Sequence, residues 1–269
     1  MSLNVKSSKD LVTSGSFKLK ALLVGVPGVG KTTFCATAPN PGFVACETGH
    51  GSGLLPIAQN NVAYVEPASY AELEAICTGQ LFKDKDTIVI DSFTEACSTF
   101  IKDEALTVPR KFGSSEKRAM GVPELDDYQV MGELARRLLR QLTRLDKHVL
   151  VTTLLRTYQP ANPKEGRAER IGGPDLPGAM SLASAAMFDH VLWLKVRPAT
   201  KPGPDGKPLR ITQRYFQTVG SDQYVAKSRS SDNKQQILPP EIVFDPATGE
   251  GCFNDLFEKI SSAYAAIKA

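Results

Sequence analysis

The stretch that decides the fold spans residues 25–32 and reads Gly25-Val26-Pro27-Gly28-Val29-Gly30-Lys31-Thr32. It fits the pattern G-x-x-x-x-G-K-[ST] in full, and the apolar run Leu19–Val24 predicts a buried strand directly before it. A helix is expected to begin at Lys31 and to end near Thr37, before Pro39. The glycines allow backbone N–H groups to turn toward phosphate oxygens, and the start of the helix adds further N–H groups. We therefore expect phosphate groups to be bound by Gly25, Val26, Pro27, Gly28, Val29, Gly30, Lys31, Thr32 and Thr33.

Side chains for the phosphates and for a metal ion are available at Lys31, Thr32 and Asp91. Lys31 is expected to reach the β- and γ-phosphates of a nucleotide, and the Thr32 hydroxyl is expected to bind Mg²⁺. Asp91 follows the β-branched run Thr87–Ile90, and the carboxyl end of a buried parallel strand is where such sheets bind ligands. We expect Asp91 to hold Mg²⁺ through water rather than only to cap the helix after it. ATP and Mg²⁺ are therefore the expected cofactors.

Hydrolysis of a phosphate bond also requires a group that activates water, and Glu47 is the candidate for this general base. Glu47 follows the predicted strand Gly42–Cys46. If this strand lies beside the strand that precedes the phosphate loop, Glu47 faces the γ-phosphate. Glu95 is the rival candidate, but it is expected to point along the helix that follows Asp91. The catalytic carboxylate is thus assigned to Glu47.

Strands and helices alternate along the first part of the chain, which indicates an α/β fold with a mainly parallel sheet flanked by helices. The predicted strands there are Leu19–Val24, Gly42–Cys46, Val62–Val65, Thr87–Ile90 and His148–Leu154, and the predicted helices are Lys31–Thr37, Ser69–Cys77, Phe93–Leu106 and Pro123–Leu145. A polar loop rich in Pro and Gly follows at 158–178. The later segments are expected to be antiparallel strands added at one sheet edge, at Val191–Val196, Arg210–Thr218 and Tyr224–Ala226, and a closing helix at Asn254–Ala269.

The composition suits a globular protein and excludes several classes. Of the 269 residues, 42% are hydrophobic and 23% are charged, so a disordered or collagen-like chain is excluded. The formal net charge of +3 does not indicate a nucleic-acid or membrane partner by itself, so any basic site must be local. No segment approaches the ~20 apolar residues of a membrane helix, and the N-terminus lacks the apolar region of a signal peptide. We therefore expect a cytoplasmic protein that has no membrane partner and whose five cysteines are unpaired thiols.

Several motifs together resemble a known group. The phosphate loop, Glu47 after the next strand, and Asp91-Ser92 after four β-branched residues resemble the RecA-like ATPase core. The stretch Tyr224-Val225-Ala226-Lys227-Ser228-Arg229 is similar to the Lys-x-Arg fingers of hexameric RecA-like helicases. Two stretches, Gly173-Pro174-Asp175-Leu176-Pro177-Gly178 and Phe188-Asp189-His190-Val191, resemble phage-encoded, AAA-type, RecA-like P-loop ATPases related to phage single-strand annealing recombinases.

This resemblance covers roughly residues 17–230 and implies a domain organisation. A flexible N-terminal arm would occupy residues 1–16, a RecA-like ATPase core residues 17–230, and a C-terminal tail and helix packing on the core residues 231–269. The phage members of the group also imply that the chain works in the cytoplasm of a host cell.

The resemblance further implies a homo-oligomer, either a ring or a filament, with a site shared between subunits. Lys227 and Arg229 would reach the γ-phosphate bound to a neighbouring subunit, where cations stabilise the charge that develops during phosphoryl transfer. Thr152, Thr153 and Arg156, at the end of strand His148–Leu154, stand where RecA-like proteins sense the γ-phosphate. Catalysis would thus depend on Lys31, Glu47, Asp91, Lys227 and Arg229.

RecA-like proteins also bind single strands through two loops that follow central strands, and two loops of this chain qualify by position. They span Arg110–Arg118 and Arg156–Arg170, and both carry an excess of basic residues. Tyr158 is available to stack on a base. The alternative is that both are ordinary solvated loops. The candidate DNA contacts are Arg110, Lys111, Lys117, Arg118, Arg156, Tyr158, Lys164, Arg167 and Arg170.

The function expected from these features is that of an ATP-binding and ATP-hydrolysing RecA-like protein, which acts on single-stranded DNA in phage recombination or replication. One alternative is a protein that anneals or coats single strands without hydrolysis, with ATP setting its oligomeric state. A second is a P-loop nucleotide kinase, because the phosphate loop is shared with that class. A GTPase is disfavoured because Asp91 is not followed by glycine three residues later and no Asn-Lys-x-Asp stretch occurs.

Overall fold

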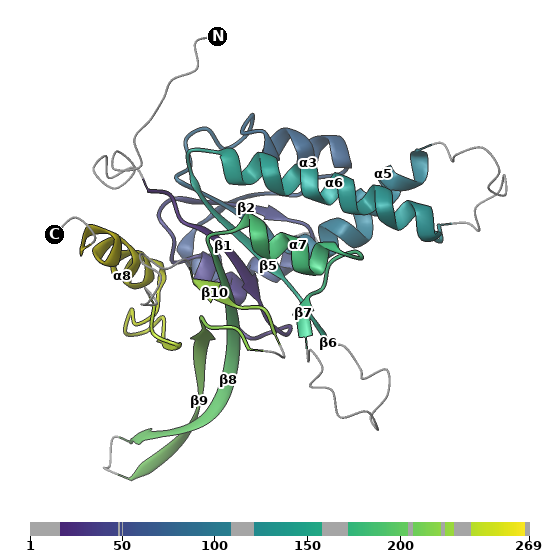
Figure 1. Cartoon of the computed structure of the whole chain (residues 1–269). Helices are drawn as coiled ribbons and strands as arrows, with labels where there is room; N and C mark the ends of the chain where they lie inside the picture. Colours follow the sequence, from purple (N-terminus) through teal and green to yellow (C-terminus); the bar gives the residue numbers. More distant parts are fainter. Residues whose placement is uncertain are drawn as a thin grey trace, which may run out of the picture.

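The computed structural model describes residues 17–47, 49, 51–108, 121–157, 172–203, 207–221, 224–228 and 238–266, and within them nine strands form one sheet with helices on both faces (Figure 1). The strands of this sheet are β1 (Lys20–Val24), β2 (Pro41–Ala45), β3 (Ala63–Val65), β4 (Thr87–Asp91), β5 (His148–Thr153), β8 (His190–Pro202), β9 (Pro208–Gln217), β10 (Lys227–Ser228) and β11 (Glu241–Phe244). A separate pair consists of β6 (Leu155–Thr157) and β7 (Gly172–Pro174).

The order of the strands in the sheet is β11-β9-β8-β1-β5-β4-β2-β3, and β10 pairs with β8 beside this path. All neighbours from β8 to β3 are parallel, whereas β9 and β10 pair with β8, and β11 with β9, in antiparallel fashion. The predicted α/β class, with a mainly parallel sheet and antiparallel strands at one edge, is confirmed. The chain leaves β1 and crosses two strands before it enters β2, so the loop after β1 lies near the middle of the sheet.

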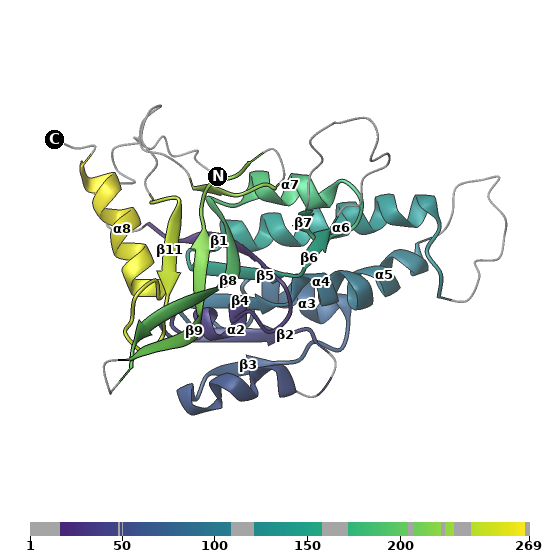
Figure 2. The same ribbon diagram turned by 90° about the horizontal axis from the view of Figure 1, so that it is seen from below.

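The helices lie on both faces of the sheet. They are α2 (Lys31–Cys35), the 3₁₀ helix η1 (Ser52–Asn60), α3 (Tyr70–Cys77), α4 (Phe93–Ala96), the π-helix η2 (Cys97–Ile101), α5 (Lys102–Thr107), α6 (Leu125–Arg144), α7 (Met180–Met187) and α8 (Phe253–Ala266). Figure 1 shows α3, α5, α6 and α7 gathered on one face. In Figure 2, α8 lies beside β11 at one end of the sheet, away from β3.

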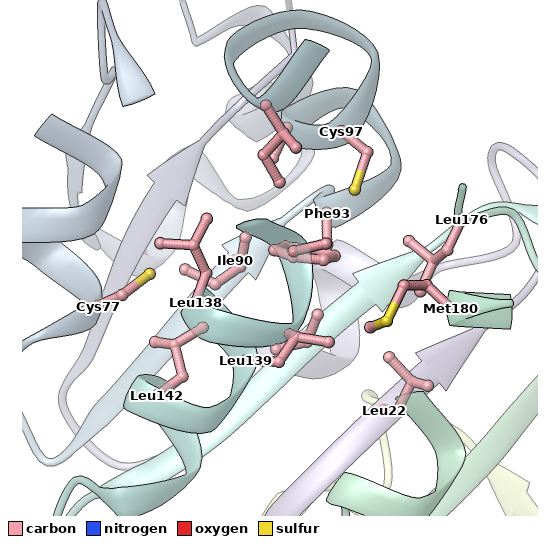
Figure 3. Packing of buried hydrophobic residues seen from close by; sticks show 14 of the residues in the cluster. Leu22, Cys77, Ile90, Phe93, Cys97, Leu138, Leu139, Leu142, Leu176 and Met180 are labelled. Atoms are coloured by element: carbon pink, nitrogen blue, oxygen red, sulfur yellow. The ribbon is translucent and has the colours of Figure 1, made fainter. Parts of the chain in front are cut away.

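Two hydrophobic cores fill the space between the sheet and its helices. Successive residues of a strand point to opposite faces, so Leu22 belongs to one core and Leu23 to the other, and both are fully buried. On the first face, Leu138 and Leu142 of α6 pack in the same cluster as Ile90 of β4 (Figure 3). Because the parallel strands are covered on both sides, they are continuous apolar runs, which explains why the sequence predicted them well.

On the second face, aromatic side chains join the segment after the phosphate loop to the C-terminal part of the chain. Phe34 of α2 contacts the rings of Phe216 and Phe244, with centroids 4.8 and 5.7 Å apart. Phe253 of α8 meets the His148 ring edge-on at 5.0 Å. β11 and α8 therefore share the core that lies behind the phosphate loop.

The sequence-based elements differ from the structure in several places. The helix predicted over Lys31–Thr37 ends at Cys35, and the one predicted over Phe93–Leu106 consists of three consecutive segments, α4, η2 and α5. The strand predicted at Tyr224–Ala226 is wrong, because Tyr224 forms only isolated bridges and the strand is Lys227–Ser228. Five elements were not predicted at all: η1, β6, β7, α7 and β11.

Two further expectations concern membrane-spanning helices and the cysteine thiols. Within the described ranges, no helix is both long enough and apolar enough to cross a membrane. All five cysteines are buried and form no disulfide bond, in agreement with the expectation of unpaired thiols.

Candidate nucleotide site

The glycine-rich loop connects β1 to α2 at the carboxyl edge of the parallel strands. Its backbone requires glycine at two positions, because φ is +73° at Gly28 and +108° at Gly30, in the region that other residues adopt only with strain. A Cβ atom at Gly28 would meet nothing within 4 Å, so this side of the loop is open. The loop thus has the left-handed turns that direct successive N–H groups toward one point, which is how such loops hold phosphate.

The Lys31 side chain folds back against the backbone at the start of the loop. Its side chain is buried, and its Nζ donates hydrogen bonds to the carbonyl oxygens of Gly25 at 2.8 Å and Val26 at 3.0 Å. Burial lowers the pKa of Lys31, while the carboxylates of Asp91 and Glu47 oppose that change. The ammonium group therefore lies within the loop and close to the acidic side chains of the site.

Asp91 is held by two hydroxyl groups from different elements. Thr32 Oγ1 donates to Asp91 Oδ2 at 2.6 Å, and Thr152 Oγ1 donates to Asp91 Oδ1 at 2.6 Å. The strand order explains this arrangement, because β5, which carries Thr152, lies between β1 and β4. Ser92, and not Asp91, is the cap of α4, since its Oγ accepts a hydrogen bond from the N–H of Glu95 at 3.4 Å. The Asp91 carboxylate is thus directed toward the loop.

The expectation that the strand before Glu47 lies beside the strand before the phosphate loop is wrong. β2 pairs with β4 and β3, and two strands separate it from β1, because the chain crosses over β5 and β4 after α2. Glu47 nevertheless lies beside the site by another route. Ala45 pairs with Asp91 in the β2–β4 register, and Glu47 follows two residues later. Glu47 is therefore a neighbour of Asp91 rather than of the phosphate-loop strand.

The electrostatic surroundings of Glu47 reflect this position. Partial burial and the negative charges of Asp91 and Glu95 raise the pKa of Glu47, with Lys31 acting in the opposite direction. Glu95 itself accepts a hydrogen bond from Ser98 Oγ at 3.1 Å, so its carboxylate is directed along its own helix. A carboxylate with a raised pKa accepts a proton more readily, which suits a general base.

Some residues at the site were missed by sequence reasoning. Arg214 of β9 donates from Nε to the carbonyl oxygen of Val29 at 3.0 Å and so contacts the phosphate loop from another strand. A Cβ atom on Gly53 would come within 2.9 Å of Glu47 Oε2, so the absence of a side chain there leaves room for the carboxylate. Neither residue carries a local signal. The Arg214 contact joins positions 185 residues apart, and Gly53 belongs to no recognised motif.

The remaining predicted residues lie away from the loop or outside the described residues. Lys227 of β10 pairs with Val191, which is level with Leu22, three residues before the loop. Arg156 lies on β6 and is exposed. The predicted contacts that fall outside the described ranges are Arg110, Lys111, Lys117, Arg118, Tyr158, Lys164, Arg167, Arg170 and Arg229.

The side chains at the loop fit Mg²⁺ and the phosphates of a nucleotide. The Thr32 hydroxyl and the Asp91 carboxylate, already 2.6 Å apart, are the hard oxygen ligands that Mg²⁺ prefers. Lys31 supplies a positive charge in the loop whose glycines leave one side open. These residues would bind the metal ion and the phosphates together, as expected when one carboxylate shares Mg²⁺ with substrate oxygens.

Comparisons with known proteins give the family of the chain. A family described as an AAA domain matches residues 18–230. Among solved structures, a KaiC-like protein from the hyperthermophilic archaeon Pyrococcus horikoshii is similar, with a TM-score of 0.42 and 15% identity over 84% of each chain. No curated protein sequence matches the chain. The family match takes in β1, the phosphate loop, Glu47, Asp91 and Lys227, which is well over half of the chain, so the chain belongs to the AAA domain family of P-loop ATPases.

Proposed function

We propose that the chain is a RecA-like ATPase that acts on single-stranded DNA in phage recombination or replication. The observation that carries the ATPase part is the position of the Asp91 carboxylate, which accepts hydrogen bonds from Thr32 and Thr152 beside the buried Lys31. This is the arrangement that nucleotide hydrolysis needs: a cation, a metal-binding pair and a nearby base. The phage role is supported by the motifs at 173–178 and 188–191, which resemble those of phage-encoded ATPases.

Each side chain of the site has a separate task in this proposal. Lys31 binds the outer phosphates, and Thr32 and Asp91 orient the metal ion, which neutralises charge on those phosphates. Glu47 accepts a proton from the attacking water, for which its raised pKa prepares it. Thr152 keeps the Asp91 carboxylate in position. Lys227 would stabilise the phosphoryl charge in a neighbouring subunit.

The proposed contact with DNA is supported by a hollow near Arg156. It has a volume of about 420 Å³ and is lined by Lys102, Tyr128 and Arg156 among others. Gly121, the first described residue after the first predicted DNA loop, also lines it. Asp175 is the acidic residue of the lining, so the two basic side chains outnumber it. Two basic side chains and one aromatic ring at one hollow suit the backbone and a base of a single strand.

The decisive experiment measures ATP hydrolysis with and without single-stranded DNA at several protein concentrations. We expect DNA to raise the turnover number, and we expect turnover per protein to rise with concentration as subunits assemble. Phosphate transfer to a nucleoside monophosphate, without stimulation by DNA, would instead identify a nucleotide kinase. Annealing activity that survives Glu47→Gln would identify a protein that uses ATP without hydrolysing it.

Lys31→Ala tests the site itself. We expect this variant to lose binding of a fluorescent ATP analogue, because Lys31 places its ammonium group against the carbonyl groups of Gly25 and Val26 in the loop. Lys83→Ala, which removes an exposed lysine before β4, is the matched control and should bind the analogue like the unchanged protein. Intact affinity in Lys31→Ala would refute the assignment of the nucleotide site.

A further inference from the structure

β8 and β9 extend beyond the sheet as a two-stranded ribbon (Figure 1). The two strands pair from Trp193 with Gln217 to Pro202 with Pro208. β1 accompanies β8 only as far as Trp193, and β11 accompanies β9 only over Arg214–Gln217. Within the described residues, the outer part of the ribbon therefore has no strand on either side. We call residues 195–202 and 207–214 the basic arm.

The basic arm concentrates positive charge. Residues 193–217 contain six Lys and Arg side chains and a single carboxylate, that of Asp205, which gives a net charge of +5 against +3 for the whole chain. The rest of the protein is therefore slightly negative. A group of like charges on one projecting element repels itself and attracts a polyanion. The six basic residues are Lys195, Arg197, Lys201, Lys207, Arg210 and Arg214.

The cations at the base of the arm are engaged within the protein. Lys195 Nζ lies 4.3 Å from the centre of the Tyr224 ring, and the Arg197 guanidinium lies 4.5 Å from the centre of the Tyr215 ring. Arg214 donates to the phosphate loop. Toward the tip, by contrast, Lys201 and Arg210 are exposed. The tip cations are thus the ones accessible to a partner.

The positions of Lys201 and Arg210 favour a flexible partner over a rigid, flat surface. Lys201 pairs with Leu209, and Arg210 pairs with Thr200. Because side chains alternate across a strand, Lys201 and Arg210 lie on opposite faces of the ribbon at nearly the same level. A rigid surface can contact only one face, whereas a single strand of nucleic acid can cross the ribbon and meet both.

The edges of the arm argue against pairing with another copy of the chain. Pro198 and Pro202 lie on β8, and Pro208 lies on β9. Proline has no N–H group, and proline and lysine on an exposed edge are the usual means by which proteins prevent another strand from pairing there. The ribbon is therefore built to remain a two-stranded element that presents its side chains.

We propose that the basic arm binds the phosphate backbone of single-stranded DNA as a contact separate from the hollow at Arg156. This inference rests on the proposed function, because it assigns a second surface to the same strand. The tip cations Lys201 and Arg210 contact the phosphates, and the exposed side chains of Val196 and Leu209 provide apolar contacts for bases.

The test compares the affinity of two double variants for a fluorescent oligo-dT strand over a range of salt concentrations. The first variant, Lys201→Ala with Arg210→Ala, removes the tip cations. The control, Arg140→Ala with Arg144→Ala, removes two exposed cations from α6, which is not part of the basic arm. We expect the arm variant to bind roughly tenfold or more weakly at about 0.1 M salt. The slope of log affinity against log salt should fall by about 1.4, since each phosphate contact on a single strand contributes about 0.7.

The outcomes separate this inference from the proposed function. If the unchanged protein binds the strand and the arm variant binds it equally well with the same salt slope, the arm proposal fails and the proposed function stands. An equal loss in the α6 variant shows a general charge effect and overturns the proposal. A changed oligomeric state of the arm variant in sedimentation also overturns it, because the arm then contacts another copy. If the unchanged protein binds no strand, both proposals fail.

Discussion

Glu47 shares one edge of the sheet with two other carboxylates, and their charges predict how hydrolysis depends on pH. Partial burial raises the pKa of Glu47 above the ordinary value for glutamate, and the negative charges of Asp91 and Glu95 add to this rise. A general base works only when it is deprotonated, so turnover should be lost on acidification at a higher pH than an ordinary glutamate would give. The measurement is the turnover number at saturating ATP as a function of pH.

Glu95→Gln is the informative companion of this prediction. It removes one of the negative charges near Glu47, so the pKa of Glu47 should fall and the loss of activity should move to lower pH. Turnover at neutral pH should be retained, because Glu95 is bonded to Ser98 of its own helix. Glu47→Gln, in contrast, should lower turnover by about 10² or more while ATP binding remains. The assignment would be reversed if Glu95→Gln, and not Glu47→Gln, abolished hydrolysis.

Thr152 and Thr153 are adjacent buried residues with different tasks. Thr152 donates to Asp91 at 2.6 Å, whereas Thr153 makes only a long contact of 3.5 Å with the carbonyl oxygen of Leu23. Thr152→Val removes a hydrogen-bond donor to the metal-binding carboxylate of Asp91. Loss of such a donor typically lowers metal affinity or activity 10- to 100-fold. We expect the Mg²⁺ concentration for half-maximal turnover to rise about tenfold or more. Thr153→Val is the comparison variant, because Thr153 does not contact Asp91, and an equal effect there would contradict the special role of Thr152.

The parts of the site that the sequence could predict are those whose signal is local. Lys31 and Thr32 belong to one short motif, and Asp91 follows a run of β-branched residues, so the sequence alone predicts all three. The arrangement around them depends on strand order, which spacing along the chain does not determine. The neighbour of the Glu47 strand was therefore predicted wrongly, and the contact of Arg214 with the loop was not anticipated.

At the scale of elements, prediction succeeded where burial leaves a clear pattern. Strands covered on both faces are continuous apolar runs, and Ser69 caps α3 as expected, since its Oγ accepts from the N–H of Glu72 at 3.3 Å. α7 was missed because Met180–Met187 consists largely of small residues, which produce no stripe of large apolar side chains, and because it follows a polar Pro/Gly-rich segment. β11 has only four residues, of which two are buried, and follows two prolines, so it gave too short a signal.

The link between β11 and the phosphate loop leads to a prediction on stability. Phe244 is 2% exposed and contacts Phe34, which belongs to the helix that follows the loop. Phe244→Ala should lower the free energy of unfolding by about 3–5 kcal/mol, the usual cost of truncating a buried phenylalanine. Leu55→Ala, at a side chain that is 72% exposed, should change it by less than about 1 kcal/mol. Urea unfolding followed by circular dichroism measures both, and similar losses would contradict the packing described here.

For the whole molecule, the position of Lys227 bears on the proposal that a homo-oligomer shares its nucleotide sites between subunits. β10 pairs with β8, which pairs with β1, so Lys227 is two strands away from the strand that leads into its own phosphate loop. It is also level with Leu22, three residues before that loop begins. This placement favours action on the site of a neighbouring subunit, in a head-to-tail assembly.

Mixing two inactive variants tests this shared site directly. Lys31→Ala destroys the phosphate loop and keeps Lys227, whereas Lys227→Ala keeps the loop and should lose about 10³ in turnover if Lys227 acts like an arginine finger. After subunit exchange at equal amounts, about one interface in four joins a sound loop to a sound lysine, given random head-to-tail assembly. The mixture should therefore recover about a quarter of the unchanged activity. If Lys227 instead acted on the loop of its own subunit, no subunit in the mixture would have both an intact loop and an intact Lys227. The mixture would then show only the residual activity of the two variants.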